Sequence, residues 1–399
     1  MRVLMVHNYY QQRGGEESIF ETESAMLEAK GHTVDLYSLH NDDIAGANPL
    51  VLAAKTLWNQ KVYQELRQTI RKTRPEIVHF HNTFPLISPA AYYAAQAEGV
   101  PVVQTLHNYR LLCPNGLFFR EGKVCEDCLG KAIPLPGVIH GCYRNSRAAS
   151  AGVAAMLSLH TFLKTWSKAV DVFIAYSQFA MNKFVEGGIP REKLAFKTNS
   201  LHPAPDVGQG QGNYALFVGR LSTEKGLGVM LDAWEQLGQK IPLKVVGDGP
   251  MAPLVQAAQA RVPNLEWVGR KPLEEVYQLM GEASFLVFPS EWYETFGRVA
   301  MEAFATGTPV IAANIGAISE LITPYQTGLH FKASDSQDLV TQVEWALSHP
   351  QEMLQMRQTV KAEFEMKYTP DKNYRRLMEI YTSILREPQK QSEIASSIN

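Results

Sequence analysis

Short apolar runs alternate with amphipathic stretches along the first half of the chain, and the same alternation starts again in the second half. Residues 17–30 have the period of an amphipathic helix, and five runs have the length and composition of buried strands: residues 3–6, 33–37, 77–81, 102–106 and 172–176. Regular alternation of strand and helix is typical of a parallel sheet covered by helices on both faces. The sequence therefore predicts an α/β fold built from two doubly wound sheets.

One segment separates the two halves. Residues 203–212 are rich in proline, glycine and polar residues, as is typical of a linker. A second alternation begins with an apolar run at residues 214–218 and continues to about residue 331, after which the pattern is helical. We predict five segments: an N-terminal Rossmann-like domain at 1–202, the linker at 203–212, a C-terminal Rossmann-like domain at 213–370, a helix at 371–388 and a polar tail at 389–399.

The charge balance excludes some classes of partner. The chain has 399 residues, and its 38 Lys and Arg against 40 Asp and Glu give a net charge of −2, which provides no general attraction for nucleic acid. Residues 1–7 form an apolar run shorter than the core of a signal peptide. No uncharged apolar run approaches the roughly 18 to 20 residues of a membrane span. We expect a soluble, cytoplasmic protein that does not bind nucleic acid.

Two glutamates stand eight positions apart around a predicted helix at residues 296–306, which follows an apolar strand at residues 285–288. Glu294 falls in the loop before this helix and Glu302 falls within it. Eight helical steps would separate the two carboxylates by roughly 12 Å, which exceeds the roughly 5 to 9.5 Å of a glycosidase pair. The spacing favours a separate role for each carboxylate on one extended ligand, while the unpaired amides at the helix start attract an anion.

A basic loop follows the strand at residues 214–218. It begins with Gly219 and Arg220 and ends with Lys225 and Gly226. Loops at the carboxyl ends of strands hold the ligand in a doubly wound sheet, so the two cations fall where phosphates bind. Two cations can stabilise a departing diphosphate without a metal ion. An isolated basic loop is usually only solvated, and this one gains weight from its combination with the two glutamates.

These motifs resemble those of the retaining glycosyltransferases of family 4. The resemblance rests on the loop Gly219, Arg220, Lys225 and Gly226, on the pair Glu294 and Glu302, and on three further segments at residues 246–250, 267–269 and 302–310. It covers most of the chain. It implies the GT-B fold, in which two Rossmann-like domains face each other across a cleft, with the last helix returning to the first domain.

The resemblance also implies residue roles in binding a nucleoside diphosphate sugar, with UDP or GDP as the nucleotide. Arg220 and Lys225 are expected to hold the diphosphate, Glu302 the ribose hydroxyls, and Glu294 the transferred sugar as a catalytic residue. A carboxylate suits ribose because two adjacent hydroxyl donors can meet its two oxygens. The remaining donor-binding residues predicted in this half of the chain are Gly219, Val268, Phe296 and Gly297.

The first domain is expected to bind the acceptor. Gly14 and Gly15 follow the first strand, where glycine lets backbone amides approach a phosphate or a sugar closely, although an ordinary tight turn explains them equally well. The resemblance places these glycines near the donor phosphate and the acceptor. It places His107 near the transferred sugar, as a second catalytic residue. The family usually has aspartate after this histidine, whereas this chain has Asn108.

Two further groups of residues are candidates for metal binding. His79 and His81 share one face of a predicted strand, but no third ligand is evident beside them in the sequence, so we do not expect a metal there. The four cysteines all fall in one window, with a Cys-x(2)-Cys centre, and predict either a structural zinc site or unligated thiols: Cys113, Cys125, Cys128 and Cys142. A subgroup of the resembling family has similar cysteines after the histidine, on the acceptor side.

Basic residues flank an apolar stretch at residues 144–168. A helix with basic ends can lie on a membrane that carries a lipid-linked acceptor, at the inner face of the membrane. The alternative is a buried helix with ordinary surface charges at its ends, and a wide apolar face favours that alternative because it normally packs against a sheet. Peripheral membrane contact is therefore an open alternative.

The combined prediction is an enzyme that transfers a hexose from a nucleoside diphosphate sugar to a hydroxyl of a saccharide or lipid-linked acceptor, in polysaccharide or glycolipid assembly. The resemblance implies retention at the anomeric carbon. No nucleophile with a paired base stands out, so we expect attack from the same face without a covalent intermediate and without a catalytic metal or other cofactor. Two alternatives stay open: an epimerase or phosphorylase on the same fold, and a noncatalytic sugar-nucleotide binding module.

Overall fold

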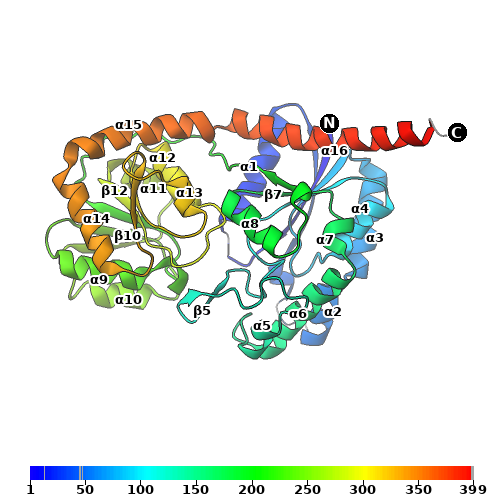
Figure 1. Cartoon of the computed structure of the whole chain (residues 1–399), viewed down its shortest axis with the longest axis horizontal. Coiled ribbons are helices and arrows are strands. Elements are labelled where there is room, and N and C mark those ends of the chain that lie inside the picture. The colour runs from blue at the N-terminus through cyan, green and yellow to red at the C-terminus, as the bar shows by residue number, and fades with distance from the viewer. Residues whose placement is uncertain (13, 45, 47, 397–399) are drawn as a thin grey trace. The chain divides into compact units, whose positions relative to one another are not determined.

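The computed structural model describes residues 1–12, 14–44, 46 and 48–396, with side chains up to residue 386 (Figure 1). The chain divides into two compact units. Unit 1 consists of Met1–Phe118, Glu126–Thr198 and Pro370–Asn399, and unit 2 consists of Phe119–Cys125 and Asn199–Thr369. Each unit contains one six-stranded parallel sheet, so the predicted α/β class with two doubly wound sheets is confirmed.

The sheet of unit 1 has the strand order β2-β1-β3-β4-β7-β8. All neighbours are parallel, and Val3 on β1 lies opposite Val34 on one side and Ile77 on the other. The five predicted strands are all present. The six strands of the sheet are β1 (Arg2–Tyr9), β2 (Thr33–His40), β3 (Ile77–Asn82), β4 (Val102–Thr105), β7 (Val172–Ala175) and β8 (Leu194–Phe196).

The helices of unit 1 connect these strands. The amphipathic helix predicted at residues 17–30 is α1 (Gly15–Ala29), which buries Phe20, Met26 and Leu27. The other helices are α2 (Pro49–Leu57), α3 (Gln60–Thr73), α4 (Ala90–Ala97), α5 (Leu135–Ile139), α6 (Arg147–Phe162), α7 (Thr165–Lys168), α8 (Gln178–Glu186) and α16 (Pro370–Ser396), with 3-10 turns at Asn41–Ile44 and Arg191–Lys193.

Helix α16 brings the end of the chain back into unit 1. Its Leu377, Ile380 and Tyr381 are buried in the same cluster as Val3 and Met5 of the central strand β1. The helix predicted at residues 371–388 extends into the segment predicted as a polar tail, because α16 continues to Ser396. The helix passes Pro388, a residue that lacks an N–H and commonly ends a helix, and residues 389–396 beyond it contain neither glycine nor proline.

The sheet of unit 2 has the strand order β11-β10-β9-β12-β13-β14, again parallel throughout. Its strands are β9 (Ala215–Val218), β10 (Leu243–Val246), β11 (Leu265–Gly269), β12 (Phe285–Phe288), β13 (Val310–Ala313) and β14 (Gly328–Phe331). The predicted strand at residues 285–288 is β12, and the apolar run at residues 214–218 is β9 with one residue fewer. A short antiparallel hairpin, β5 (Phe119–Arg120) and β6 (Lys123–Val124), also belongs to unit 2.

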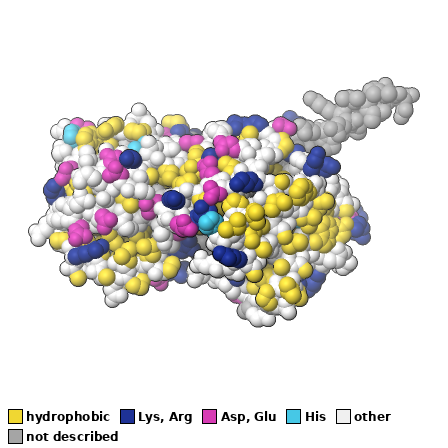
Figure 2. Space-filling model, turned by 60° about the horizontal axis from the view of Figure 1, so that its bottom comes forward, with side chains coloured by type: hydrophobic (Ala, Val, Ile, Leu, Met, Phe, Trp, Pro, Cys, Tyr) yellow, Lys and Arg dark blue, Asp and Glu magenta, His cyan; other side chains and the backbone are white. Residues whose placement is uncertain are grey.

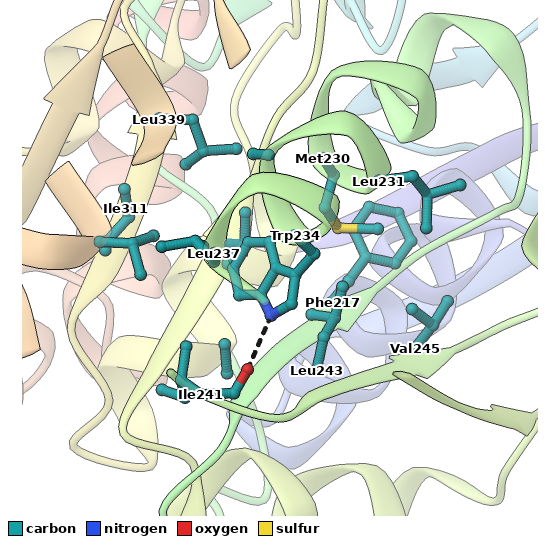
Figure 3. Close-up of a cluster of buried hydrophobic side chains, with 14 of the residues drawn as sticks. Phe217, Met230, Leu231, Trp234, Leu237, Ile241, Leu243, Val245, Ile311 and Leu339 are labelled. Atoms are coloured by element: carbon teal, nitrogen blue, oxygen red, sulfur yellow. Dashed lines mark hydrogen bonds between the residues drawn. The ribbon is translucent and has the colours of Figure 1, made fainter. Parts of the chain in front are cut away.

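The helices of unit 2 are α9 (Leu227–Leu237), α10 (Ala252–Ala258), α11 (Leu273–Glu282), α12 (Arg298–Ala305), α13 (Ile318–Leu321), α14 (Ser336–Ser348) and α15 (Pro350–Lys367), with a 3-10 turn at Thr223–Lys225. Trp234 on α9 lies at the centre of the unit 2 core, fully buried against the apolar side chains of β9, β10 and β13 (Figure 3). Its indole N–H donates to the carbonyl of Ile241 at 3.0 Å, so the one polar atom of this side chain is satisfied.

The glycine-rich segment predicted as a linker runs along the surface of unit 2. The amide of Gly208 donates to the carbonyl of Thr306, and Arg357 donates to the carbonyl of Gly208 at 3.2 Å. A Cβ on Gly208 would lie 2.2 Å from the backbone of Gly281, so only glycine permits this approach. The glycine content of residues 203–212 therefore serves close backbone packing as well as connection.

Candidate functional site

The order in which successive strands are added to each sheet indicates where a ligand binds. In unit 2 the chain adds β10 and β11 on one side of β9, and then adds β12, β13 and β14 on the other side. In a doubly wound sheet the ligand crevice opens at this reversal, beyond the carboxyl ends of the two central strands. The loop after β9 carries Arg220 and Lys225, and the loop after β12 carries Glu294. We call these residues, with Glu224 and Glu302, the unit 2 site.

Backbone contacts hold these loops together. The amide of Glu291 donates to the carbonyl of Glu224 at 2.9 Å, and the amide of Leu221 donates to the carbonyl of Asp248 at the same distance. Gly226 has φ of 69° and begins α9, and a Cβ there would lie 1.8 Å from the carbonyl oxygen of Pro289. Glycine is therefore required here for two reasons: the backbone is left-handed, and the Pro289 carbonyl leaves no room for a Cβ.

Lys225 and Glu294 are in direct contact. The ammonium of Lys225 lies 2.5 Å from Oε1 of Glu294, and the same oxygen accepts from Ser290 Oγ at 3.0 Å and from the indole N–H of Trp292 at 2.9 Å. The Lys225 ammonium also lies 5.3 Å from the centre of the Trp292 ring. Three donors thus fix the orientation of one carboxylate oxygen. The sequence predicted a separate role for each of these two side chains, and the structure brings them together as one charged pair.

Arg220 is the exposed cation of the unit 2 site. Its side chain is 57% exposed, and its guanidinium lies 2.5 Å from Glu224. Burial raises the pKa of Glu224, but hydrogen bonds from Ser222 and Arg220 outweigh it, so the pKa lies below its ordinary value. Glu224 is therefore an anion that orients Arg220. Sequence reasoning missed Glu224, because it lies in the loop after β9, where residue spacing does not predict which side chains pair.

Glu302 lies in α12, as predicted, and is buried. Burial raises the pKa of Glu302, while Arg298, whose Nε is 2.8 Å away, acts in the opposite direction. The sequence analysis did not identify Arg298. Its position one helical turn before Glu302 could have identified it as the partner.

The helix predicted at residues 296–306 begins two residues later, at Arg298. Gly297 has φ of 100°, in the left-handed region, so the backbone cannot be helical there. Phe296 instead packs in the core against Tyr368, with ring centres 5.9 Å apart. The amides that could face an anion are those of the first turn of α12, and Phe296 is not among them.

Two other predicted donor-binding residues lie at the ends of β9 and β11, which are separated by β10. Gly219 directly follows β9, and its amide donates to the carbonyl of Val246 at 3.1 Å. Val268 is the penultimate residue of β11 and is half-buried. The structure thus places both at the carboxyl edge of the unit 2 sheet.

Unit 1 has a reversal of its own between β1 and β3, because β2 lies on one side of β1 and the strands β3, β4, β7 and β8 lie on the other. Side chains at the ends of these strands are tied together, since Asn82 donates to the carbonyl of Asn8 at 2.7 Å. A small pocket lies beside this edge. Among its lining residues are Asn82, Thr83, His107, Asn108 and Arg110, which we call the unit 1 site.

The glycine-rich loop of unit 1 differs from its prediction. Gly14 is the N-cap of α1, and its backbone is extended, with φ of −127° and ψ of −172°, which any residue can adopt. Its amide donates to the carboxylate of Glu17, which also accepts from the amide of Tyr10 at 2.9 Å. The Gly14 amide that was expected to approach a phosphate is therefore already hydrogen-bonded to the Glu17 side chain of the first turn of α1. Gly15 is the first residue of α1.

Glu16 places a carboxyl group beside Asn108. Its Oε2 accepts from Asn108 Nδ2 and from the Tyr10 hydroxyl, each at 3.4 Å, while its Oε1 is buried without a hydrogen-bond partner. Burial, together with the nearby charge of Glu17, raises the pKa of Glu16 to about 8. Sequence reasoning missed Glu16. The helix α1 thus supplies a carboxyl group next to the position at which the family usually has aspartate.

His107 follows β4, where the sequence placed it. Its Nε2 lies 3.0 Å from Nδ1 of His81, and the two rings stack with centres 5.1 Å apart. Burial and the neighbouring His81 lower the pKa of His107 well below its ordinary value, so the imidazole is neutral at pH 7. A neutral imidazole can both donate and accept a hydrogen bond.

His79, His81 and Glu23 bring three potential metal-ligand atoms within 4.8 Å of one another. Both nitrogens of His79 are already used, by the Tyr381 hydroxyl at 2.7 Å and by Thr105 at 2.8 Å. The ammonium of Lys197 lies 2.6 Å from Glu23, where a cation would repel a metal ion. The group fits a buried hydrogen-bonded cluster better than a metal site.

The cysteines do not form a compact ligand set within unit 1. The sulfur of Cys113 contacts Asn115 Oδ1 at 2.9 Å, and the sulfur of Cys128 lies 3.8 Å from the carbonyl of Pro134. Among the described residues of unit 1, the sulfurs of Cys113, Cys128 and Cys142 do not all lie within 4.8 Å of one another, and Cys125 belongs to unit 2. A structural zinc ion stays a prediction.

None of the helices in the described part of the chain is both long and apolar enough to cross a membrane.

Two family models match consecutive parts of the chain. Residues 13–196 match the model described as Glycosyltransferase Family 4, and residues 205–363 match the model described as Glycosyl transferases group 1. An uncharacterized glycosyltransferase of Methanocaldococcus jannaschii is 29% identical over 180 residues, which is 45% of this chain and 50% of that protein. The matched region thus spans half the length of this relative.

A second relative matches over a longer region. An uncharacterized 42.6 kDa protein in the cps region of Klebsiella pneumoniae is 26% identical over 359 residues, which covers 80% of this chain and 87% of the relative. Among solved structures, that of HepE from Anabaena in complex with UDP superposes with a TM-score of 0.71 at 17% identity, covering 96% of this chain and all of the other. The same protein has been solved with UDP-glucose. At this identity the structural match shows a shared GT-B fold.

Proposed function

This chain belongs to the glycosyltransferases of the family 4 type, and on that premise we propose that it transfers a hexose from a nucleoside diphosphate sugar to a hydroxyl acceptor, with retention at the anomeric carbon. The observation that carries the proposal is the unit 2 site. Around the reversal of the unit 2 sheet, Lys225 pairs with Glu294 and Arg220 pairs with Glu224, and Glu302 pairs with Arg298 in the helix that follows. The complexes of HepE with UDP and UDP-glucose support a donor of this class.

Arg220 and Lys225 hold the donor diphosphate in this proposal. The bond from the anomeric carbon to the diphosphate oxygen breaks, and its electron pair stays with the diphosphate. Positively charged groups placed beside the growing negative charge lower the barrier more than they stabilise the bound substrate. The amides in the first turn of α12 act in the same direction. This arrangement supplies stabilisation without a metal ion.

The two carboxylates of the unit 2 site then divide their roles. Glu302, held by Arg298, accepts the two ribose hydroxyls, and Glu294, held by Ser290 and Trp292, accepts a hydroxyl of the transferred hexose. Because Lys225 contacts both Glu294 and the diphosphate in this proposal, it couples the sugar position to the phosphate position. The acceptor oxygen attacks from the face that the diphosphate leaves, and its proton passes to the departing diphosphate.

We also propose that the acceptor is a saccharide or a lipid-linked saccharide, as in polysaccharide or glycolipid assembly. Apolar side chains gather on one face of unit 1 (Figure 2), where α6 packs against both α2 and α5. The exposed apolar residues of this region are Leu50, Val51, Ile133, Leu135, Ile139, Phe162 and Leu163. Arg144, Arg147, Lys164 and Lys168 flank α6. Such a surface supports peripheral contact with an anionic membrane that carries the acceptor.

Binding of nucleotides by unit 2 tests the donor site directly. UDP, GDP and ADP, each with and without a hexose, are titrated while the melting temperature is measured. A nucleotide at a hundred times its Kd stabilises the folded protein by about 2.7 kcal/mol. In Arg220→Ala we expect the affinity for the stabilising nucleotide to fall at least about tenfold, because a charged hydrogen bond to phosphate is lost.

Arg261→Ala is the matched control for this substitution. Arg261 is also an exposed arginine of unit 2 paired with a glutamate, Glu235 at 3.6 Å, and it lies outside the unit 2 site. We expect this variant to bind nucleotide as the wild type does. Equal nucleotide affinity in Arg220→Ala and in the wild type would contradict the diphosphate role.

Turnover distinguishes the proposed function from its alternatives. A transferase releases nucleoside diphosphate in proportion to the glycosylated acceptor that it forms. An epimerase or a phosphorylase would convert the donor without a hydroxyl acceptor, and a noncatalytic module would bind the donor without converting it. Chromatography of the nucleotide and sugar products, with saccharide and lipid-linked acceptors in parallel, separates these outcomes.

A further inference from the structure

Unit 1 contains a buried polar cluster that the donor site does not use. Glu23 on α1, His79 and His81 on β3, and Lys197 after β8 are each at most 3% exposed. The Lys197 ammonium lies 2.6 Å from Glu23 Oε2 and donates to Asn373 of α16 at 3.2 Å. Buried charges persist only when they are paired. Although burial raises the pKa of Glu23, Lys197 and the two histidines hold it well below its ordinary value, so Glu23 is an anion.

A chain of polar atoms runs from this cluster to the unit 1 site. Glu23 Oε1 and His81 Nε2 lie 3.3 Å apart, and both are buried without a regular hydrogen bond among the described residues. Glu23 Oε1 is also 3.3 Å from His79 Nδ1, but that nitrogen is used by the Tyr381 hydroxyl at 2.7 Å. The other nitrogen of His81, Nδ1, lies 3.0 Å from His107 Nε2. His107 lines the small pocket together with Asn82 and Asn108. Three side chains, from α1, β3 and the loop after β4, thus lie in a row between a buried carboxylate and the pocket.

The charge of Glu23 determines the direction of the hydrogen bonds along this chain. A carboxylate only accepts, so a proton on His81 must be on Nε2 to face Glu23. A His81 ring with its one proton on Nε2 has a lone pair on Nδ1, and this lone pair requires His107 to donate from its Nε2. We propose that Glu23, acting through His81, holds His107 in the tautomer that has its proton on Nε2 and its lone pair on Nδ1.

The consequence for catalysis rests on the proposed function. A lone pair on Nδ1 of His107 lets this histidine accept a hydrogen bond from a sugar hydroxyl at the pocket, whereas the other tautomer would present an N–H group there. Glu23 and His81 are positioning residues, because they act on the sugar only through His107. When His107 is in the other tautomer, it cannot accept the hydrogen bond from the sugar hydroxyl and the turnover rate falls, while the nucleotide site on unit 2 is unchanged.

Glu23→Gln tests the proposal because it reverses the direction of the hydrogen bonds from residue 23 to His107, with almost no change in the shape of the side chain. The Lys197 ammonium still requires an acceptor, so the amide oxygen faces Lys197 and the amide N–H₂ group faces His81. His81 then accepts on Nε2 and donates from Nδ1, and His107 accepts on Nε2 and keeps its proton on Nδ1. The tautomer of His107 is read from the two side-chain nitrogen shifts in ¹⁵N NMR spectra of histidine-labelled protein, assigned by the signal lost in His107→Gln.

We expect the Nε2–H form of His107 in the wild type and the Nδ1–H form in Glu23→Gln. Tyr381→Phe is the matched control, because it removes a hydrogen bond to His79 in the same buried cluster without interrupting the chain. It should leave the tautomer of His107 unchanged. The same tautomer in the wild type and in Glu23→Gln, or an equal change in Tyr381→Phe, would overturn the proposal.

His81→Phe keeps the test decisive if Glu23→Gln does not fold. The phenyl ring preserves the stacking on His107 and leaves the Glu23 and Lys197 pair intact. It cannot make a hydrogen bond between Glu23 and His107, so His107 should become a mixture of tautomers. A pure Nε2–H form in this variant would contradict the proposal. In kinetics, both variants should lower kcat by about tenfold or more while the KM for the donor stays within about twofold. Because the NMR result requires no turnover, it stands or fails separately from the transferase assignment.

Discussion

The carboxyl group of Glu16 shows how one residue can change the chemistry expected of a site. The sequence directs attention to Asn108, which cannot carry a negative charge. The structure places Glu16 within hydrogen-bonding distance of Asn108 and the Tyr10 hydroxyl. The charge missing at residue 108 is thus available from α1 once Glu16 ionises, and its pKa of about 8 makes that ionisation sensitive to pH.

Glu16→Gln should reveal this ionisation in the pH dependence of stability. The pKa of Glu16 is about 8 in the folded protein and 4.5 as its ordinary value, so folding favours the protonated form. That stabilising contribution is fully present below pH 4.5 and is lost as the pH rises through 8. Relative to Glu16→Gln, the melting temperature of the wild type should fall over this interval and level off above it.

Glu28→Gln is the control for this experiment, because Glu28 is an exposed glutamate of the same helix. We expect its melting temperature to follow the wild type across the whole pH range. A constant difference between the wild type and Glu16→Gln from pH 4.5 to 9 would show that the Glu16 carboxyl titrates normally.

Residue spacing predicted part of the two sites. It placed Arg220, Lys225, Glu294 and Glu302 on the correct elements, because loops at strand ends and a helix start can be identified from local sequence. It missed Glu16, whose relation to Asn108 depends on how α1 and β4 come together across 92 positions. It also missed the direct pairing of Lys225 with Glu294 across 69 positions. Contacts of this kind follow from sheet order, which no local pattern contains.

At the scale of elements, the unit 2 site depends on how closely two loops approach. The loop after β9 and the loop after β12 touch through backbone atoms at Gly226 and Pro289. The predicted strands all begin within one residue of the observed ones, since buried strands are continuous apolar runs, but β1 and β2 continue three residues beyond the predicted ends. The start of α12 was predicted two residues early, because the apolar Phe296 continues the helical pattern while Gly297 takes a left-handed backbone. Hydrophobic periodicity indicates which residues are buried, but it does not indicate their backbone φ and ψ angles.

Gly226→Ala should separate these two loops. A left-handed conformation costs a non-glycine residue about 1–2 kcal/mol, and the added Cβ would lie 1.8 Å from the Pro289 carbonyl oxygen, which cannot yield without moving the loop after β12. We expect a lower melting temperature together with a loss of nucleotide stabilisation of at least about tenfold in affinity, because Lys225 and Glu294 would no longer meet.

Gly228→Ala provides the comparison two residues further along. Gly228 lies in α9, and a Cβ there meets nothing within 4 Å. Alanine in a helix is favoured over glycine by roughly 0.5–1 kcal/mol, so this variant should be slightly more stable and should bind nucleotide normally. Wild-type nucleotide binding by Gly226→Ala would show that loop contact does not position the site.

At the scale of the whole molecule, unit 1 is assembled from both ends of the chain. Helix α16 supplies Leu377, Ile380, Tyr381 and Ile384 to the core that contains the central strand β1. It also supplies Asn373 and Tyr381 to the buried polar cluster around Glu23. Periodicity predicted a helix near this position. The return to unit 1 came only from the family resemblance, because an apolar helical face does not identify the surface that it covers.

Leu377→Ala should destabilise unit 1 by about 2–5 kcal/mol, as is usual for a fully buried leucine. Glu379→Ala lies on the exposed side of the same helix, in an ion pair with Arg376, and should change stability by less than about 1 kcal/mol. Urea denaturation followed by hydrogen exchange of β1 amides reports unit 1 specifically. Similar protection of these amides in both variants would show that α16 contributes little to the unit 1 core.

The return of α16 has a consequence for the order of biosynthesis. A ribosome delivers all six strands of the unit 1 sheet early, yet the helix that covers their core emerges only after all of unit 2 has been made. Since domains usually fold as they leave the ribosome, unit 2 can reach its native state while unit 1 still exposes apolar surface. The N-terminal half of this polypeptide should therefore be the last part to mature, and the part most dependent on chaperones until translation ends.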